Sequence, residues 1–155
     1  MKHGCLIFIL SFAAFFAATV WFSLINRESI GIPTSADIKY VRIAEQDIKV
    51  ELALSKEAQT RGLSGRDGLA EGEGMLFVYS RPGKYSFWMK DMKFPIDIIW
   101  IGEDMRVVYI KESAEPASYP DVFVSGADAK YILEVNAGFS EKNSLKVGDG
   151  ALFTY

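Results

Sequence analysis

The side chains with the strongest potential for chemistry are charged groups that interrupt apolar runs of the sequence. Asp97 and Glu134 each lie within a run of apolar residues that is typical of a buried strand. A buried carboxylate needs a cation or several hydrogen-bond donors, because burial removes its water. The natural cationic partners are Arg61, Arg66 and Lys90. We therefore expect these charged groups to lie close together in the folded chain.

Two interpretations of these charges remain open. In the first, they form structural ion pairs that hold a glycine-rich loop onto a sheet. In the second, they form a polar pocket at one end of a β-barrel, containing Arg61, Lys90, Asp97 and Glu134. Two carboxylates in one cleft, roughly 5–9.5 Å apart, could also perform glycosidase-type acid–base catalysis.

Trp88 is the aromatic residue with the clearest binding potential. In a strand it shares one face with Lys84, Ser86 and Lys90, while Phe87 and its neighbours of the same parity face the other way. A tryptophan on a semi-polar face can stack on a sugar ring, a base or a quaternary cation. The alternative interpretation is a half-buried tryptophan that only packs against the second face of its strand.

The distribution of histidine and cysteine restricts the possible chemistry. The chain has one histidine, His3, and one cysteine, Cys5, so every residue from Lys39 onward lacks both imidazole and thiol. Ser-His-Asp and Cys-His nucleophile systems are therefore excluded, as are the usual zinc, copper and iron–sulfur sites. No phosphate-binding or dinucleotide-binding glycine motif is present. We predict no cofactor, no metal and no catalytic residue, which favours a binding or structural protein over an enzyme.

The N-terminus predicts a membrane or export segment. Residues 4–25 are 22 residues without a charge, and a helix of that length spans about 33 Å, close to the hydrocarbon core of a bilayer. We expect residues 1–25 to be an uncleaved membrane anchor, with a cleaved signal peptide and a secreted product as the alternative. Lys2 favours a cytoplasmic N-terminus, which leaves the rest of the chain in the periplasm or outside the cell. The formal net charge of −3 and the lack of a basic run predict no nucleic-acid binding.

The pattern after the anchor is that of a β domain. Residues 26–36 are polar, contain glycine and proline, and are predicted to be a linker to a single domain at 37–155. Short helices are expected at Lys56–Arg61 and within 137–145, and a long loop without strands at 113–128. Alternating or apolar runs predict eight strands, at 38–43, 47–54, 75–79, 84–89, 96–101, 105–111, 130–135 and 151–155. The expected fold class is mainly β, a small antiparallel β-barrel or a pair of packed sheets with one or two short helices.

Several blocks of the sequence resemble a known family. They are Arg61-Gly62-Leu63 with Gly74–Phe77, then Phe87–Lys90 with Pro95–Ile98, and finally Tyr131–Glu134 with Gly138 and Gly148-Asp149. In order and spacing these blocks are similar to the bacterial and archaeal family named domain of unknown function 192, over about Val50 to Phe153. The family pattern has Asn-Thr where this chain has Asp91-Met92, and Met where it has Ser64.

The resemblance implies a small, mainly β domain, often behind a signal peptide or anchor, and no established activity. It also implies that the residues within its blocks belong to one site. The candidate ligand-binding residues are therefore Arg61, Trp88, Lys90, Asp97 and Glu134. The expected function is a noncatalytic cell-envelope module that binds a small molecule or a protein. The alternatives are a hydrolase using Asp97 and Glu134, or a structural core of ion pairs without a ligand site.

Overall fold

The computed structural model describes residues 34–155. The predicted anchor at residues 1–25 and the first part of the predicted linker lie outside the described residues. No helix within 34–155 has the length and apolar character needed to cross a membrane.

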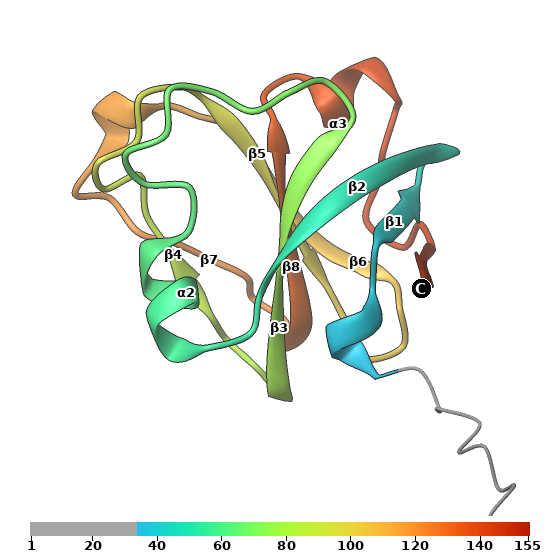
Figure 1. Cartoon of the computed structure of the whole chain (residues 1–155). Helices are drawn as coiled ribbons and strands as arrows, with labels where there is room; N and C mark the ends of the chain where they lie inside the picture. The colour runs from blue at the N-terminus through green and yellow to red at the C-terminus, as the bar shows by residue number, and fades with distance from the viewer. Residues whose placement is uncertain (1–33) are drawn as a thin grey trace, which may run out of the picture. The chain divides into compact units, whose positions relative to one another are not determined.

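Nine strands and two short α-helices form the described part of the chain (Figure 1). The strands are β1 (Tyr40–Ile43), β2 (Gln46–Ala53), β3 (Glu73–Gly83), β4 (Ser86–Phe87), β5 (Ile96–Ile101), β6 (Val107–Ala114), β7 (Phe123–Val124), β8 (Ala129–Asn136) and β9 (Ala151–Thr154). The helices are α2 (Lys56–Arg61) and α3 (Phe139–Lys142), and single 3-10 turns lie at Ser35–Asp37 and Pro116–Ser118. Helix α2 and strand β5 have the predicted bounds. Strand β7 lies in the predicted loop, because two residues are too few to produce a periodic pattern.

Seven strands form one curled sheet in the order β6-β5-β8-β3-β2-β1-β9, and β4 and β7 form a second, small sheet. The prediction of a mainly β fold with short helices is confirmed. The prediction of a small antiparallel β-barrel or a pair of packed sheets is correct only in part, since the large sheet curls into a half-barrel and β2 and β3 run parallel with Lys49 opposite Glu73. The connection between them contains α2 and the glycine-rich segment, and a parallel pair requires a crossover of about a dozen residues or more.

The sheet curls into a half-barrel whose two outer strands meet at one end only. The amide of Val107 donates to the Asp149 carbonyl at 2.9 Å, and the amide of Gly148 donates to the Val107 carbonyl at 2.8 Å. The amide of Ala151 donates to the Met105 carbonyl at 2.8 Å. These bonds join the starts of β6 and β9 and satisfy edge groups that would otherwise be open to another chain.

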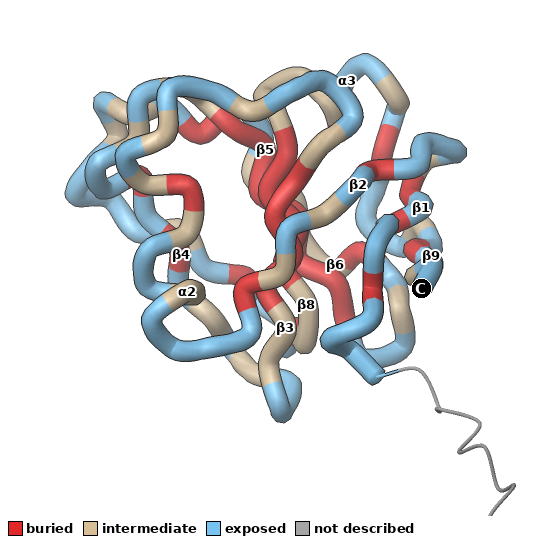
Figure 2. The backbone as a smooth tube through the Cα atoms, viewed as in Figure 1, coloured by how far each residue is buried: buried red, intermediate tan, exposed pale blue. Residues whose placement is uncertain are grey.

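Strand β5 separates two apolar cores. All six of its residues are buried, which agrees with the prediction that both of its faces are apolar. Ile99 and Ile101 pack in a core with β1, β2 and β9, whereas Ile98 and Trp100 pack in a second core with Phe77 and its neighbours beneath α2 and β4. Figure 2 shows the buried residues concentrated in the central strands of the curled sheet. A side chain on a central strand is therefore assigned to one core or the other by its position in the strand.

Candidate functional site

Asp97 is held by backbone amides rather than by a cation. Its side chain is fully buried, at 0 % exposure. Its Oδ1 atom accepts hydrogen bonds from the amides of Ser113 at 2.8 Å and Gly138 at 3.2 Å, and its Oδ2 atom accepts one from the amide of Ser140 at 2.8 Å. The prediction of a basic partner for Asp97 is therefore wrong, because three amide donors supply what the carboxylate needs.

These three bonds give Asp97 a structural role. Ser113 lies where the β5–β6 register shifts between Ile96 and Ile98, and its φ angle is +44°. Gly138 and Ser140 lie at the start of α3. One carboxylate thus ties the irregular part of β6 and the beginning of α3 to the centre of the sheet.

The register of β5 and β8 places Asp97 and Glu134 on opposite faces. Asp97 lies opposite Val135, and Glu134 lies opposite Ile98. Side chains alternate along a strand, so Asp97 lies on the face of Val135 and Glu134 on the face of Ile98, which belong to different cores. The hypothesis of a hydrolase that uses this pair is wrong, since its two carboxyl groups would need one shared cleft.

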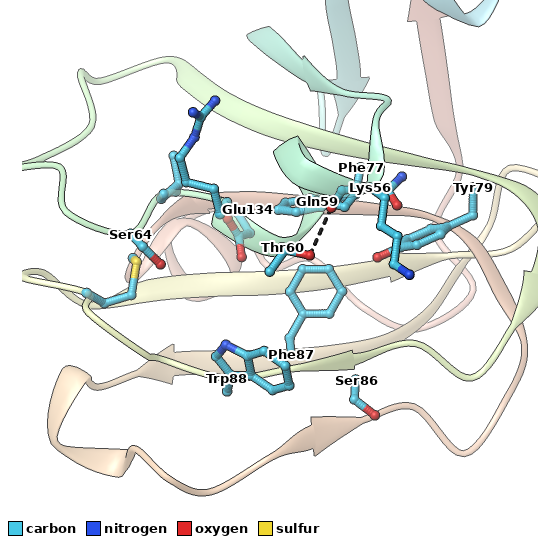
Figure 3. A pocket seen from close by; sticks show the side chains of 14 residues that line it. Lys56, Gln59, Thr60, Ser64, Phe77, Tyr79, Ser86, Phe87, Trp88 and Glu134 are labelled. Atoms are coloured by element: carbon cyan, nitrogen blue, oxygen red, sulfur yellow. Dashed lines mark hydrogen bonds between the residues drawn. The ribbon is translucent and has the colours of Figure 1, made fainter.

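Glu134 belongs instead to a cavity of about 210 Å³ between α2 and the small sheet. The lining comes from α2, the residues that follow it, and strands β3, β4 and β8. It consists of Lys56, Gln59, Thr60, Arg61, Gly62, Leu63, Ser64, Phe77, Tyr79, Ser86, Phe87, Trp88, Met92 and Glu134. Figure 3 shows these side chains around the space, with Trp88 and Phe87 below Thr60 and Glu134 in this view.

Helix α2 is fastened to the sheet by a glutamine. The Ser55 side chain caps the helix by accepting from the amide of Ala58 at 3.2 Å. The Nε2 atom of Gln59 donates to the carbonyls of Ala53 at 3.2 Å and Val78 at 2.9 Å, which joins the helix to β2 and β3. These bonds position the helix face that carries Lys56, Gln59 and Thr60 along one side of the cavity.

Gly62 covers Glu134 where α2 ends. Its φ angle is +50°, a conformation that favours glycine. A β-carbon at this position would lie 3.3 Å from the Phe77 ring and 3.8 Å from Glu134 Oε2. The absence of a side chain lets the chain turn closely over the carboxyl group and shield it from water.

The Glu134 carboxyl group is buried, and one of its oxygen atoms lacks a hydrogen-bond partner. The residue is 5 % exposed, and its Oε2 atom has no partner among the described residues. Burial raises the pKa of Glu134 to about 8, while the positive charge of Arg66 acts in the opposite direction. Arg66 does not neutralise this carboxyl directly, because its guanidinium group binds both oxygens of Glu51 at 2.8 and 2.7 Å. At neutral pH, Glu134 is therefore mainly a neutral acid that can donate a hydrogen bond.

Tyr79 does not provide a base for this cavity. Its ring stacks on Tyr85 with the centroids 3.4 Å apart. Burial raises the pKa of Tyr79 to about 12, and the nearby Tyr85 and Glu134 add to this effect. The phenol thus stays protonated at physiological pH and offers only a polar edge and a ring surface.

The structure brings together three of the five predicted ligand-binding residues. Arg61, Trp88 and Glu134 line the cavity, with Trp88 at 46 % exposure. Lys90 has an exposed side chain outside the lining, and its carbonyl accepts a hydrogen bond from Ser64 Oγ at 2.8 Å. The prediction of one pocket that includes Asp97 is wrong, because the β5–β8 register turns this side chain to the other face.

Sequence reasoning identified Arg61 at the end of α2 but missed three other polar residues of this helix, Lys56, Gln59 and Thr60. The predicted helix at Lys56–Arg61 was correct, and the i, i+3, i+4 spacing of Lys56, Gln59 and Thr60 indicates a shared face. This spacing in the sequence indicates that the three side chains share one helix face. It does not indicate which part of the fold that face packs against. Phe77 and Tyr79 were assigned to a strand, and only the parallel placement of β3 beside β2 brings them under α2.

The described residues show no arrangement typical of a metal site. Within 34–155, no group of three or more histidine, cysteine, aspartate or glutamate side chains lies close enough to hold a metal ion. The cavity itself contains one carboxyl group, two basic side chains, several hydroxyl or amide groups, and aromatic walls. This composition can bind and orient a small molecule.

Fold and site define a curled β domain that has a small, mixed polar and aromatic cavity under α2. The chain belongs to the DUF192 family, described as "Uncharacterized ACR", whose model matches residues 39–152. The resemblance to that family is thereby confirmed. No curated protein matches the chain.

Two solved structures are similar to this chain at 30 % sequence identity. A protein of unknown function from Novosphingobium aromaticivorans DSM 12444 superposes with a TM-score of 0.70 over 74 % of this chain and 84 % of its own. A protein from Sinorhizobium meliloti 1021, described provisionally as a transcription regulator, has a TM-score of 0.68 over 74 % of this chain and 90 % of its own. Both likenesses support the curled sheet as the common architecture.

The role of Asp97 predicts that Asp97→Asn destabilises the domain. An amide nitrogen in place of one carboxylate oxygen leaves at least one buried backbone donor without an acceptor, at a cost of about 1–3 kcal/mol. Urea unfolding of the variant and the wild type at one pH measures this difference. The exposed Asp128→Asn is the matched control and should unfold like the wild type. Equal stability of Asp97→Asn and the control would contradict the structural role.

The buried acid predicts a pH-dependent effect of Glu134→Gln. The carboxyl has its ordinary pKa of 4.5 in the unfolded chain and about 8 in the folded protein. The folded state therefore keeps a proton that the unfolded state loses. The contribution of Glu134 to the free energy of unfolding therefore decreases by about 1.4 kcal/mol per pH unit between pH 4.5 and pH 8. Glutamine does not ionise, so the Glu134→Gln variant lacks this decrease. Its free energy of unfolding relative to the wild type should therefore rise from pH 5 to pH 8.

Urea unfolding at pH 5, 6, 7 and 8 measures this gain. The exposed Glu112→Gln is the control, and its difference from the wild type should stay nearly constant over the series. A constant difference for Glu134→Gln as well would show that the carboxyl is ionised in the folded protein throughout this range.

Proposed function

We propose that the domain is a noncatalytic module that binds a small ligand in the cavity under α2. The observation that carries this proposal is the combination of a half-exposed tryptophan with a buried, unpartnered carboxyl group around a space of about 210 Å³. A buried polar group without a partner reduces stability, so its presence in a cavity favours a ligand that satisfies it. Trp88 offers a ring face at the same opening.

The cavity residues favour binding over catalysis. The domain lacks histidine and cysteine, and Asp97 lies on the other face of the sheet. Glu134 is thus the single carboxyl group in the lining, and Tyr79 stays protonated at physiological pH. Two of the lining hydroxyl groups are held by backbone carbonyls rather than by a base, since Thr60 Oγ1 donates to the Lys56 carbonyl and Ser64 Oγ to the Lys90 carbonyl, both at 2.8 Å.

Tryptophan fluorescence of the full-length chain tests the binding function. A Trp21→Phe background leaves Trp88 and Trp100, of which Trp100 is 0 % exposed and donates from Nε1 to the Tyr85 carbonyl at 3.1 Å. A panel of envelope glycans and small metabolites should contain a compound that shifts the emission and protects Trp88 from acrylamide. The same compound should leave the emission of a Trp88→Phe variant unchanged.

The competing interpretation is a structural core without a ligand. It is supported if no compound changes the Trp88 signal and if Trp88→Ala cells behave like the wild type while the variant protein stays folded. That combined result would remove the proposed function.

We further propose that the domain works at the cell envelope, held by residues 1–25. The support is the uncharged stretch at 4–25, which is long enough to span a bilayer as a helix. We expect the full-length protein to stay in the membrane fraction after a carbonate wash and to be cleaved by protease added outside the inner membrane. Release by carbonate, or a mature N-terminus that begins after Val20, would contradict the anchor.

A further inference from the structure

Two uncompensated positive charges lie on the α2 side of the cavity. Lys56 and Arg61 both line it from α2 and are exposed. Within residues 34–155, neither side chain takes part in an ion pair. Arg66, from the segment after α2, contributes further positive potential, but Glu51 of β2 compensates its charge at 2.7 Å. The rim thus attracts negative charge more strongly than positive charge.

The bottom of the cavity does not cancel this charge at neutral pH. Glu134 of β8 is 5 % exposed, and burial keeps it mainly protonated. Tyr79 of β3 also stays neutral, and Ser86 and Phe87 of β4 and the following Trp88 carry no charge. The lining therefore has a net positive charge and an acid proton that an anion can accept as a hydrogen bond.

The walls limit the shape of the ligand. Phe77 and Phe87 meet edge to face with centroids 4.8 Å apart, and the exposed ring of Trp88 lies at the opening. A volume of about 210 Å³ is smaller than a pocket for a drug-sized molecule. A flat or apolar body of about one ring fits this space and can stack on an aromatic face.

We propose that the cavity binds a small organic carboxylate, with one anionic group joined to a flat or apolar body. This inference rests on the proposed function and specifies its ligand. The Glu134 carboxyl group donates a hydrogen bond to the carboxylate, Arg61 and Lys56 neutralise its charge, and Trp88 stacks on its body. A cationic ligand is disfavoured because it would bring its charge next to two unpaired basic side chains.

Three probes that share one ring test the charge of the ligand. They are benzoate, benzyl alcohol and benzyltrimethylammonium, titrated into the full-length chain in detergent at pH 7 with protein-free micelles as the blank. Binding is measured by Trp88 fluorescence in the Trp21→Phe background, with Trp88→Phe as the control for non-specific effects. Benzoate should bind at least tenfold more tightly than either of the other two.

The pH dependence tests the role of Glu134. Benzoate remains ionised at pH 7 and pH 9, whereas Glu134 loses its proton across a pKa of about 8. The affinity of the wild type for benzoate should therefore be about tenfold lower at pH 9 than at pH 7. Glu134→Gln keeps a hydrogen-bond donor and should bind benzoate with an affinity that changes less than about twofold over the same range.

The charge on the rim is tested separately. Arg61→Gln should weaken benzoate binding by about two- to fivefold and reduce its dependence on salt. Arg81→Gln is the matched control, since Arg81 is exposed and lies outside the lining. Equal losses in both variants would contradict a specific contribution of Arg61 and overturn its assigned role.

The possible outcomes separate this inference from the proposed function. Tighter binding of benzyltrimethylammonium or benzyl alcohol that depends on Trp88 would overturn the carboxylate inference and leave a binding module. An affinity for benzoate that stays constant or rises from pH 7 to pH 9 would also overturn it, because ionisation of Glu134 removes the donor and adds a negative charge that repels benzoate. If none of the three probes binds, the carboxylate inference fails, and the wider compound panel decides the proposed function.

Discussion

The pairing of β5 with β8 at the centre of the sheet is the constraint on which the rest of the structure depends. Glu134 lies opposite Ile98, and Asp97 lies opposite Val135. This register sends two buried carboxyl groups into two different cores, and a shift of one residue would exchange their environments. One carboxyl group then stabilises the fold and the other lines a cavity.

The two buried acids show how surroundings determine the role of one chemical group. Three backbone amides surround Asp97, so its buried side chain has donors on both oxygens. Glu134 has an apolar roof formed by Gly62 and Phe77 and no donor at Oε2. The first arrangement fixes the positions of α3 and β6, whereas the second leaves a hydrogen-bonding group available to a ligand.

Local patterns in the sequence predicted several elements well. The capping serine and the charge pattern predicted α2, and the apolar run predicted β5 with its exact bounds. Alternation along residues 84–90 predicted that Phe87 and Trp88 face opposite ways, and the structure buries Phe87 and leaves Trp88 at 46 % exposure. These signals are local, since a cap acts over one turn and alternation follows from the geometry of a single strand. The motif blocks also identified the family, whose model matches residues 39–152.

The sequence by itself determined which chemical groups the domain contains: no imidazole or thiol, two carboxyl groups in apolar strands, and a tryptophan with basic neighbours. It also determined the mainly β class, because period-two patterns report which residues share a face. Only the tertiary structure decided which of these groups meet. Strand register, the parallel β2–β3 crossover and the placement of α2 depend on contacts between distant segments, and no local pattern encodes them. For that reason Arg61, Trp88 and Glu134 share a cavity, while Asp97 lies behind the sheet among backbone amides.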